Sequence, residues 1–125
     1  MKTLTTKLSV DEAVAKLQEG IEATNMRQVS HINGQANAKM IGATVTADQI
    51  LEIFRPDFAI KVWSACKAAG HDIPLRIHVY EDDQSTVVAC RLPTEVFEPF
   101  DSENLMHVGA ELDEIFLKIL SFVEV

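Results

Sequence analysis

The chain has 125 residues, of which 47% are hydrophobic, and a formal net charge of −8. A chain of this length predicts a single domain, here residues 1–125, that buries roughly two-thirds of its unfolded surface on folding. The acidic balance argues against a general nucleic-acid or anionic-membrane binder, since both need a basic surface. No apolar run is long enough to cross a bilayer. The first seven residues lack a signal-peptide core, so we expect a cytoplasmic protein, or a periplasmic one if a signal was removed.

The first quarter of the chain predicts two strands and an intervening helix. Residues 3–8 alternate weakly between apolar and polar side chains, as in a strand. Ser9 and Glu12 form a capping box, which opens a helix with apolar side chains at helical spacing. We expect that helix to end at Asn25. Residues 26–32 predict the second strand, and an Asn-Gly pair ends it.

The middle of the chain is the least determined part. The Gly and Thr residues of 35–48 indicate a loop with a short helical turn inside it. Residues 50–54 fit a third strand or a short helix, because their periodicity does not decide between the two. A proline then precedes a predicted helix over residues 57–69, which Gly70 would close at its C′ position.

Residues 73–93 carry the densest signal, a β-hairpin with two unlike faces. Leu75, Ile77 and Val79 alternate with polar side chains at a period of two, and residues 82–85 supply the turn. Pairing across that turn gives one wholly apolar face that must join a core. Cys90 lies on that face, so we expect an inert core thiol. The other face carries Arg76, His78, Tyr80, Val87, Ala89 and Arg91.

The non-core face of the hairpin suggests a first functional hypothesis. Arg76 is predicted to lie opposite Arg91, and like charges directly opposite destabilise a strand pair. We therefore expect an acidic group between them, from this chain, a partner or a ligand. The hypothesis is a non-enzymatic module that binds an acidic small molecule or partner group. The two arginines would hold the acid, and His78 and Tyr80 would orient it by hydrogen bonding.

The predicted order of elements is β-α-β-β-α-β-β-α, an α+β fold. The last helix begins after Asp101 or Ser102 and has a continuous apolar stripe. The predicted architecture has two layers, a mainly antiparallel sheet with helices packed on one face, which leaves the other face open. Because Tyr80, Val87 and Ala89 would be uncovered there, we expect a homodimer that removes them from water.

Histidines and cysteines raise two further hypotheses. His31 and His78 would share the open face if their strands are neighbours, and together with His107 and methionines they would bind copper or haem iron. Alternatively, Cys66 or His78 is the reactive group of a small thiol- or His-dependent enzyme. No HxH or HxxxH spacing, P-loop or nucleophile elbow is present. The simpler interpretation, partly exposed histidines that bind nothing, stays open.

Several short motifs occur here in the order of a known family. They are Ser9-Val-Asp-Glu-Ala-Val14, Arg55-Pro56 before an apolar helix, Ile73-Pro74, His78-Val-Tyr-Glu-Asp82 and Val87-Val-Ala-Cys-Arg-Leu-Pro93. Over residues 2–99 and the closing helix, the chain resembles the DUF302 domains of bacteria and archaea, which have no established activity. The resemblance implies an α+β sandwich that pairs as a homodimer, and it implies no catalytic residues. Members often carry cysteines where Phe54 and Leu75 stand here, so no thiol chemistry is carried over.

Overall fold

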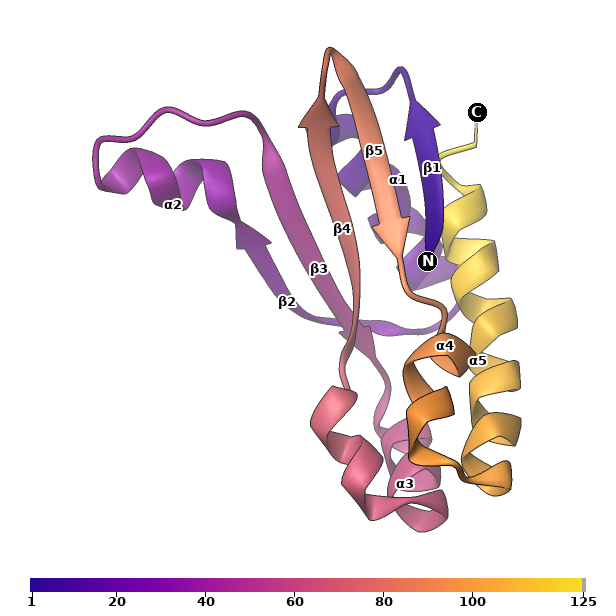
Figure 1. Cartoon of the computed structure of the whole chain (residues 1–125). Coiled ribbons are helices and arrows are strands. Elements are labelled where there is room, and N and C mark those ends of the chain that lie inside the picture. Colours follow the sequence, from indigo (N-terminus) through magenta and orange to yellow (C-terminus); the bar gives the residue numbers. More distant parts are fainter. Residues whose placement is uncertain (125) are drawn as a thin grey trace.

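The computed structural model describes residues 1–124, which form one five-stranded sheet and its helices (Figure 1). The sheet order is β1-β5-β4-β3-β2, and every neighbouring pair is antiparallel. This confirms the α+β class, and residues 50–54 belong to a strand. The elements are β1 (Lys2–Thr6), α1 (Val10–Ala23), β2 (Arg27–Asn33), α2 (Gly34–Met40), β3 (Asp48–Phe54), α3 (Pro56–Ala65), η1 (Lys67–Asp72), β4 (Leu75–Asp82), β5 (Ser85–Cys90), α4 (Pro93–Phe97), η2 (Glu98–Phe100) and α5 (Glu103–Ser121), where η marks a 3₁₀ helix.

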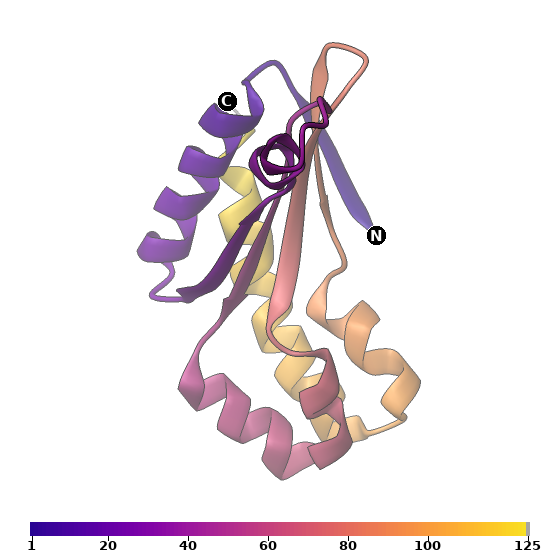
Figure 2. The ribbon, with the colours of Figure 1, turned by 90° about the vertical axis from the view of Figure 1, so that its left-hand side faces the viewer.

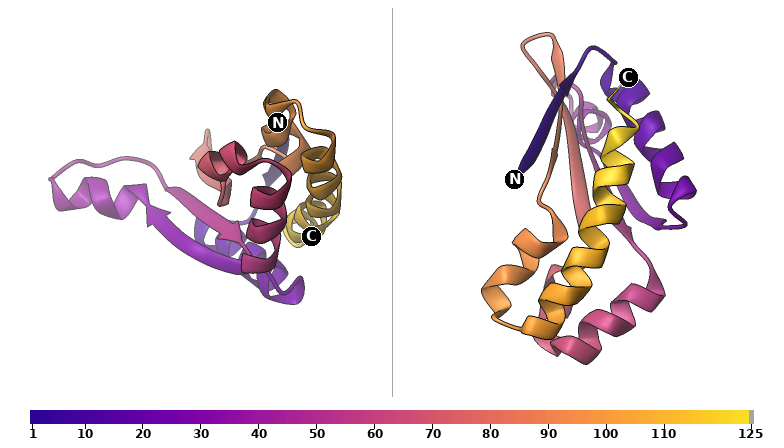
Figure 3. Two further views of the ribbon diagram at one scale, coloured as in Figure 1. Left: turned by 90° about the horizontal axis from the view of Figure 1, so that it is seen from below. Right: turned by 90° about the vertical axis from the view of Figure 1, so that its right-hand side faces the viewer.

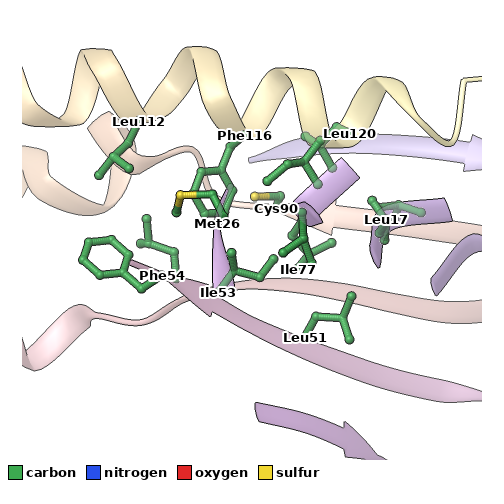
Figure 4. Packing of buried hydrophobic residues seen from close by; sticks show 14 of the residues in the cluster. Leu17, Met26, Leu51, Ile53, Phe54, Ile77, Cys90, Leu112, Phe116 and Leu120 are labelled. Carbon is green, nitrogen blue, oxygen red and sulfur yellow. The ribbon is translucent and has the colours of Figure 1, made fainter. Parts of the chain in front are cut away.

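The two long helices, α1 and α5, form a layer on a single face of the sheet. Figures 2 and 3 show α1 and α5 beside each other on that face, while α3 and α4 lie towards one end. The two long helices approach closely at Gly20, where a Cβ atom would lie 2.9 Å from Phe122 Cδ1. The core lies between this layer and the sheet and includes Met26, Phe116 and Cys90 (Figure 4). The opposite face of the sheet carries no long helix.

The two long helices begin where a side chain can cap them. Ser9 Oγ accepts from the Glu12 amide at 3.1 Å, and Glu12 Oε1 accepts from the Ser9 amide at 2.9 Å, so the predicted capping box is confirmed. After α1 the chain turns at Asn25, which has a φ of 60°. The last helix is capped by Ser102, whose Oγ accepts from the Leu105 amide at 3.2 Å.

The helix expected over residues 57–69 is shorter than predicted, and Gly70 does not close it. Helix α3 ends at Ala65, Cys66 is extended with a φ of −162°, and η1 follows. Gly70 has no left-handed φ; among residues 1–124 the only glycine with one is Gly42. Its role is a close approach instead, because a Cβ at Gly70 would lie 2.8 Å from Trp63 Nε1. The break after α3 lets the chain fold back under that indole.

Residues 34–47 form a projection from the sheet, and the helical turn expected in this segment is the helix α2. Asn33 Oδ1 accepts from the Ala36 amide at 3.0 Å and caps α2, which stands apart from the other helices (Figure 1). The chain then returns to β3 in an extended path. No helix within residues 1–124 is long and apolar enough to cross a membrane.

Candidate functional site

The hairpin places its two faces as the alternation predicts. Val79 pairs with Val88 and Ile77 with Cys90, and all four side chains are buried. The hairpin loop is the two residues Asp83 and Gln84, with φ values of 48° and 67°. Both residues are left-handed, as a type I′ turn requires. Because side chains alternate along a strand, Arg76, His78 and Tyr80 all lie on the sheet face away from α1 and α5.

The open face is less apolar than the sequence predicts. Val87 is only 8% exposed, so the expectation that it is uncovered is wrong. It lies between the half-buried Tyr80 and the strand β1, where Thr5 is its partner. Closing the sheet with β1 beside β5 removes much of the Val87 side chain from water. Ala89 and Tyr80 remain partly accessible.

The predicted contact between Arg76 and Arg91 is replaced by an ion pair within the sheet. Strand β5 ends at Cys90, so Arg91 lies just beyond the ladder. On its other side Arg76 pairs with Glu52 of β3, and its Nη2 donates to Glu52 Oε2 at 3.3 Å. Ser30 Oγ of β2 donates to the other oxygen of Glu52 at 2.6 Å. This chain therefore supplies an acidic partner for Arg76 on the open face.

A cavity of about 780 Å³ lies at one end of the open face, between η1 and α4. We call it the open-face cavity. Arg76, Arg91 and His78 all line it, whereas Tyr80 lies just outside and stacks on His78 with ring centroids 4.6 Å apart. The other side chains that line it are a mixture of polar or charged and apolar ones. They include Glu52, His71, Asp72, Glu95, Ile50, Ala89, Pro74 and Val96.

The two arginines differ in how far their charge is already satisfied. Arg91 is exposed and forms no ion pair within residues 1–124. Glu95, which also lines the open-face cavity, is held by the amino group of Met1 at 2.8 Å. That hydrogen bond lowers the pKa of Glu95, and the nearby Arg91 charge adds to the effect. Because Glu95 is bound to another cation, the Arg91 guanidinium has no carboxylate partner in the described part of the chain, and its donors can bind a further acceptor.

His78 is held in place by a carboxylate and an aromatic ring. Its Nε2 lies 3.0 Å from both oxygens of Asp48, which pairs with Tyr80 across the ladder. An ionised carboxylate only accepts, so Nε2 is the donor and the neutral ring carries its proton there. The other ring nitrogen is then an acceptor in the neutral form and a donor in the protonated form. This fixed imidazole can therefore orient a ligand in either state.

The three candidate metal ligands do not come together. His31 pairs with the buried Leu51, so it lies on the helix-covered face, whereas His78 lies on the open face. The condition for a shared site, neighbouring strands, is not met because β3 separates β2 from β4. His107 is exposed on α5, in the other layer. Within residues 1–124 no group of three or more His, Cys, Asp or Glu side chains has the arrangement of a metal site.

His31 instead belongs to a polar chain at the edge of the helical layer. One ring nitrogen lies 2.6 Å from Gln49 Oε1, and Gln49 Nε2 donates to Asp11 Oδ1 at 2.8 Å. Gln49 is only 4% exposed, so both ends of its amide need partners. The arrangement accounts for His31 by structure, without a ligand.

The two thiols lie apart from the open-face cavity. Cys90 is buried in the core, and burial raises its pKa to about 12, with the charges of Glu95 and Asp113 adding to the shift. Such a thiol stays protonated at neutral pH. Cys66 is half-buried at the end of α3 and does not line the open-face cavity. Of the two groups suggested for an enzyme, only His78 reaches the cavity.

Sequence reasoning missed the carboxylates that organise this face. Glu52 and Asp48 both lie on β3. Glu52 is within residues 50–54, which fitted a strand or a helix equally well, and Asp48 fell in the undetermined segment 35–48, so their neighbours could not be assigned. The alternation of Ile50 and Glu52 with buried Leu51 and Ile53 carries the signal in retrospect. It becomes informative only when β3 is known to pair with β4, since that register puts Glu52 beside Arg76.

Comparisons with known proteins agree on one family. The sequence model described as "Domain of unknown function DUF302" matches residues 2–123. A solved structure, the uncharacterised conserved protein DUF302 from Bacillus stearothermophilus, superposes with a TM-score of 0.89 at 18% identity. The match covers 98% of this chain and 96% of that one. No curated protein matches the chain.

Proposed function

The chain belongs to the DUF302 family, a domain of unknown function, and from the geometry of its open face we propose that it is a small binding module for an acidic group. The binding site is the open-face cavity, where Arg76 and Arg91 hold the acid. His78, fixed by Asp48, orients it by hydrogen bonding, and Tyr80 supports His78 by stacking. The observation that carries the proposal is that Arg91 has no ion pair among residues 1–124 and lies beside an accessible cavity of about 780 Å³.

Hydrogen-bond capacity supports this role for both arginines. A guanidinium has five N–H donors and no acceptor. Arg76 is 65% exposed and uses one donor, at 3.3 Å, on Glu52. Its remaining donors, and those of Arg91, are available to a carboxylate or phosphate. Charge-assisted bonds of that kind contribute roughly 1.5–3 kcal/mol each.

The rest of the lining limits what the acid can be attached to. Glu52, Asp72 and Glu95 would repel a compound that is anionic throughout, while Ile50 and Val96 offer apolar contact. A suitable ligand therefore carries one acidic end and a neutral or apolar remainder. The volume suits a small molecule, since ligand pockets typically measure about 300–1,000 Å³.

Thermal unfolding with simple acids tests the site. The probes are inorganic phosphate and butyrate, titrated at fixed ionic strength. A ligand at about 100 times its Kd stabilises a protein by about 2.7 kcal/mol, which raises Tm by several degrees in a domain of this size. We expect this rise in the parent, and we expect Arg91→Gln and Arg76→Gln to lose most of it.

Arg27→Gln is the matched control, because Arg27 is exposed on the edge strand β2 and does not line the open-face cavity. It should respond like the parent. The proposal fails if phosphate and butyrate raise no Tm in the parent. It fails equally if the parent and all three variants shift together, because the acids would then act on the whole protein rather than at this site.

We also propose that the protein works as a homodimer. The sheet carries helices on one face only, and Ile50, Tyr80 and Ala89 are partly accessible on the other. A second copy related by a twofold axis would remove these surfaces from water in both chains at once. Sedimentation at micromolar concentration checks this, and a species of 13.9 kDa alone would contradict it.

For the compartment, we propose the cytoplasm. Cys66 and Cys90 are both free thiols, which persist in a reducing environment. Fractionation of cells that express the untagged protein tests this, and recovery of the protein from the periplasm would contradict it.

A further inference from the structure

The segment that projects beside the sheet has a surface unlike the rest of the molecule. We call residues 29–47 the arm; it comprises most of β2, the whole of α2 and the return to β3. None of its residues is buried. Of the nine large hydrophobic side chains that are exposed in residues 1–124, five lie on it. They are Val29, Ile32, Met40, Ile41 and Val45.

The arm is built to hold a shape even though it has no core. Gln35 Nε2 of α2 donates to the Val45 carbonyl at 3.1 Å, which ties the helix to the returning chain. The Ala47 carbonyl accepts from the Glu81 amide at 3.0 Å, which anchors the return to β4. Met40 and Ile41 remain 83% and 85% exposed. A helix as short as α2 gains almost nothing from propensity alone, so its apolar end needs a surface to cover it.

The charge of the arm indicates which surface would cover its apolar end. The arm contains Lys39 and no acidic residue, although the chain has 19 acidic residues and a net charge of −8. It is therefore a neutral-to-basic element on an acidic protein, and a second copy of this chain offers it a complementary surface. On the open face Asp48 pairs with Tyr80, and Asp82 lies two residues beyond Tyr80 on the same strand, so both are acidic neighbours at the arm's end of the sheet.

The arm is also continuous with the open face. Ile32 of β2 pairs with Ile50 of β3, which pairs with His78 of β4, which in turn pairs with Ala89 of β5. These side chains lie in one row on the same face, so Ile32, Ile50 and Ala89 form an apolar strip, interrupted by His78, that runs from the middle of the sheet onto the arm. In an isologous pair, each copy can place its arm on the strip of the other.

We infer that the arm is the dimerisation element: each copy lays Met40 and Ile41 on the open face of its partner. The inference rests on the proposed homodimer and adds the surface that forms it. The contact uses the end of the sheet where β3 begins, and the open-face cavity extends from the middle of the sheet towards η1 and α4. Because Ile50, His78 and Ala89 of this strip also line the open-face cavity, acid binding and pairing share part of the open face.

Sedimentation equilibrium of the full chain tests the inference with charge substitutions. Ile41→Asp places a carboxylate among apolar contacts and against an acidic surface, so its dimer Kd should rise about tenfold or more. Ile41→Lys should weaken pairing less than Ile41→Asp does. The control is Ile60→Asp on α3, another exposed isoleucine, 59% accessible, that lies outside the arm. Because none of these side chains is buried, circular dichroism should confirm that every variant is folded.

The outcomes separate this inference from the proposals on which it stands. A dimeric parent and Ile60→Asp protein with a weakened Ile41→Asp protein supports the arm. A dimeric parent that neither substitution affects overturns the arm and leaves the homodimer standing. A weakening of equal size at both positions also overturns it. A monomeric parent overturns the homodimer and the arm together, and phosphate binding at Arg91 then decides the acid-binding proposal on its own.

Discussion

Glu52 stands directly across from Arg76 on neighbouring strands, and the two side chains join at 3.3 Å between Oε2 and Nη2. Two arginines on one face of a hairpin would repel each other, and the Glu52 carboxylate offsets the positive charge of Arg76. It leaves one arginine of the open-face cavity partly neutralised and the other, Arg91, without an ion pair among residues 1–124. Glu52 is therefore in a position to regulate how strongly the cavity attracts an anion.

We predict that Glu52→Gln strengthens anion binding. The glutamine keeps an acceptor for Ser30 but removes the negative charge beside Arg76. Stability should change by less than about 1 kcal/mol, since Arg76 is 65% exposed. The phosphate-dependent rise in Tm should exceed that of the parent at equal ionic strength. A smaller rise would mean that Glu52 positions Arg76 for the ligand rather than competing with it.

A second prediction concerns the pH dependence of the capping box. Hydrogen bonds from the backbone and side chain of Ser9 lower the pKa of Glu12 below its usual 4.5 in the folded state. A carboxylate with a depressed folded pKa stabilises the protein above its unfolded pKa, and that contribution is lost as pH falls through the folded pKa. Glu12→Gln should therefore be less stable than the parent at neutral pH, and urea unfolding should show the difference shrinking well below pH 4.5. A difference that stays constant with pH would contradict the capping assignment.

How far the sequence predicts the fold depends on whether the signal is local. The capping box, the hairpin register and the apolar stripe of α5 all follow from spacing within a few residues, and the structure confirms them. The end of α3 could not be predicted in this way. Gly70 is expected to terminate the helix, but its lack of a side chain makes room for the Trp63 indole instead. Periodicity cannot report a contact that forms only after the chain folds back.

In the candidate site, too, the residues placed by local spacing could be predicted and those placed by strand pairing could not. Arg76, His78 and Tyr80 share a face because they alternate along one strand, which the sequence shows directly. Their partners Glu52 and Asp48 arrive from β3, across a loop of undetermined length. The predicted metal site does not form because His31 and His78 lie on opposite faces of the sheet. Only the register of β2 on β3 reveals this, and that register cannot be read from the sequence.

We predict that Cys90 is unreactive in the native state. Burial raises its pKa to about 12, so the thiolate is almost absent at neutral pH. In Cys66→Ala protein, a thiol reagent should therefore modify Cys90 only after unfolding in denaturant. The unfolded thiol ionises near 9 and the folded one near 12, so native stability should also fall as pH rises across that interval. Rapid labelling of native Cys66→Ala protein would contradict the buried placement.

Gly20 supports a prediction about the crossing of α1 and α5. A Cβ there would lie 3.1 Å from both the Cα and the carbonyl oxygen of Ile119, which are backbone atoms and cannot rotate away. Alanine gains up to about 1 kcal/mol in helix propensity, but overpacking costs about 1–3 kcal/mol. Gly20→Ala should therefore lower the free energy of unfolding in urea. Ala15→Gly, at an exposed site of the same helix, calibrates the propensity term, and a stabilised Gly20→Ala protein would contradict the close approach.

A Cβ atom at Gly70 would be at least as close to its nearest neighbour as one at Gly20, but its close neighbours are side-chain atoms alone, so we predict a smaller loss of stability. Its Cβ would lie 2.8 Å from Trp63 Nε1, but this indole is 43% exposed and Lys67 Nζ lies 4.8 Å from its ring centroid. A rim side chain can swing into water where the Ile119 backbone cannot. Gly70→Ala should destabilise the protein by less than about 1 kcal/mol, within the range of surface substitutions. Because Trp63 is the single tryptophan, its emission should shift to the red in the variant. An unchanged spectrum with a loss as large as that of Gly20→Ala would show that the indole is fixed and that the backbone of η1 moves instead.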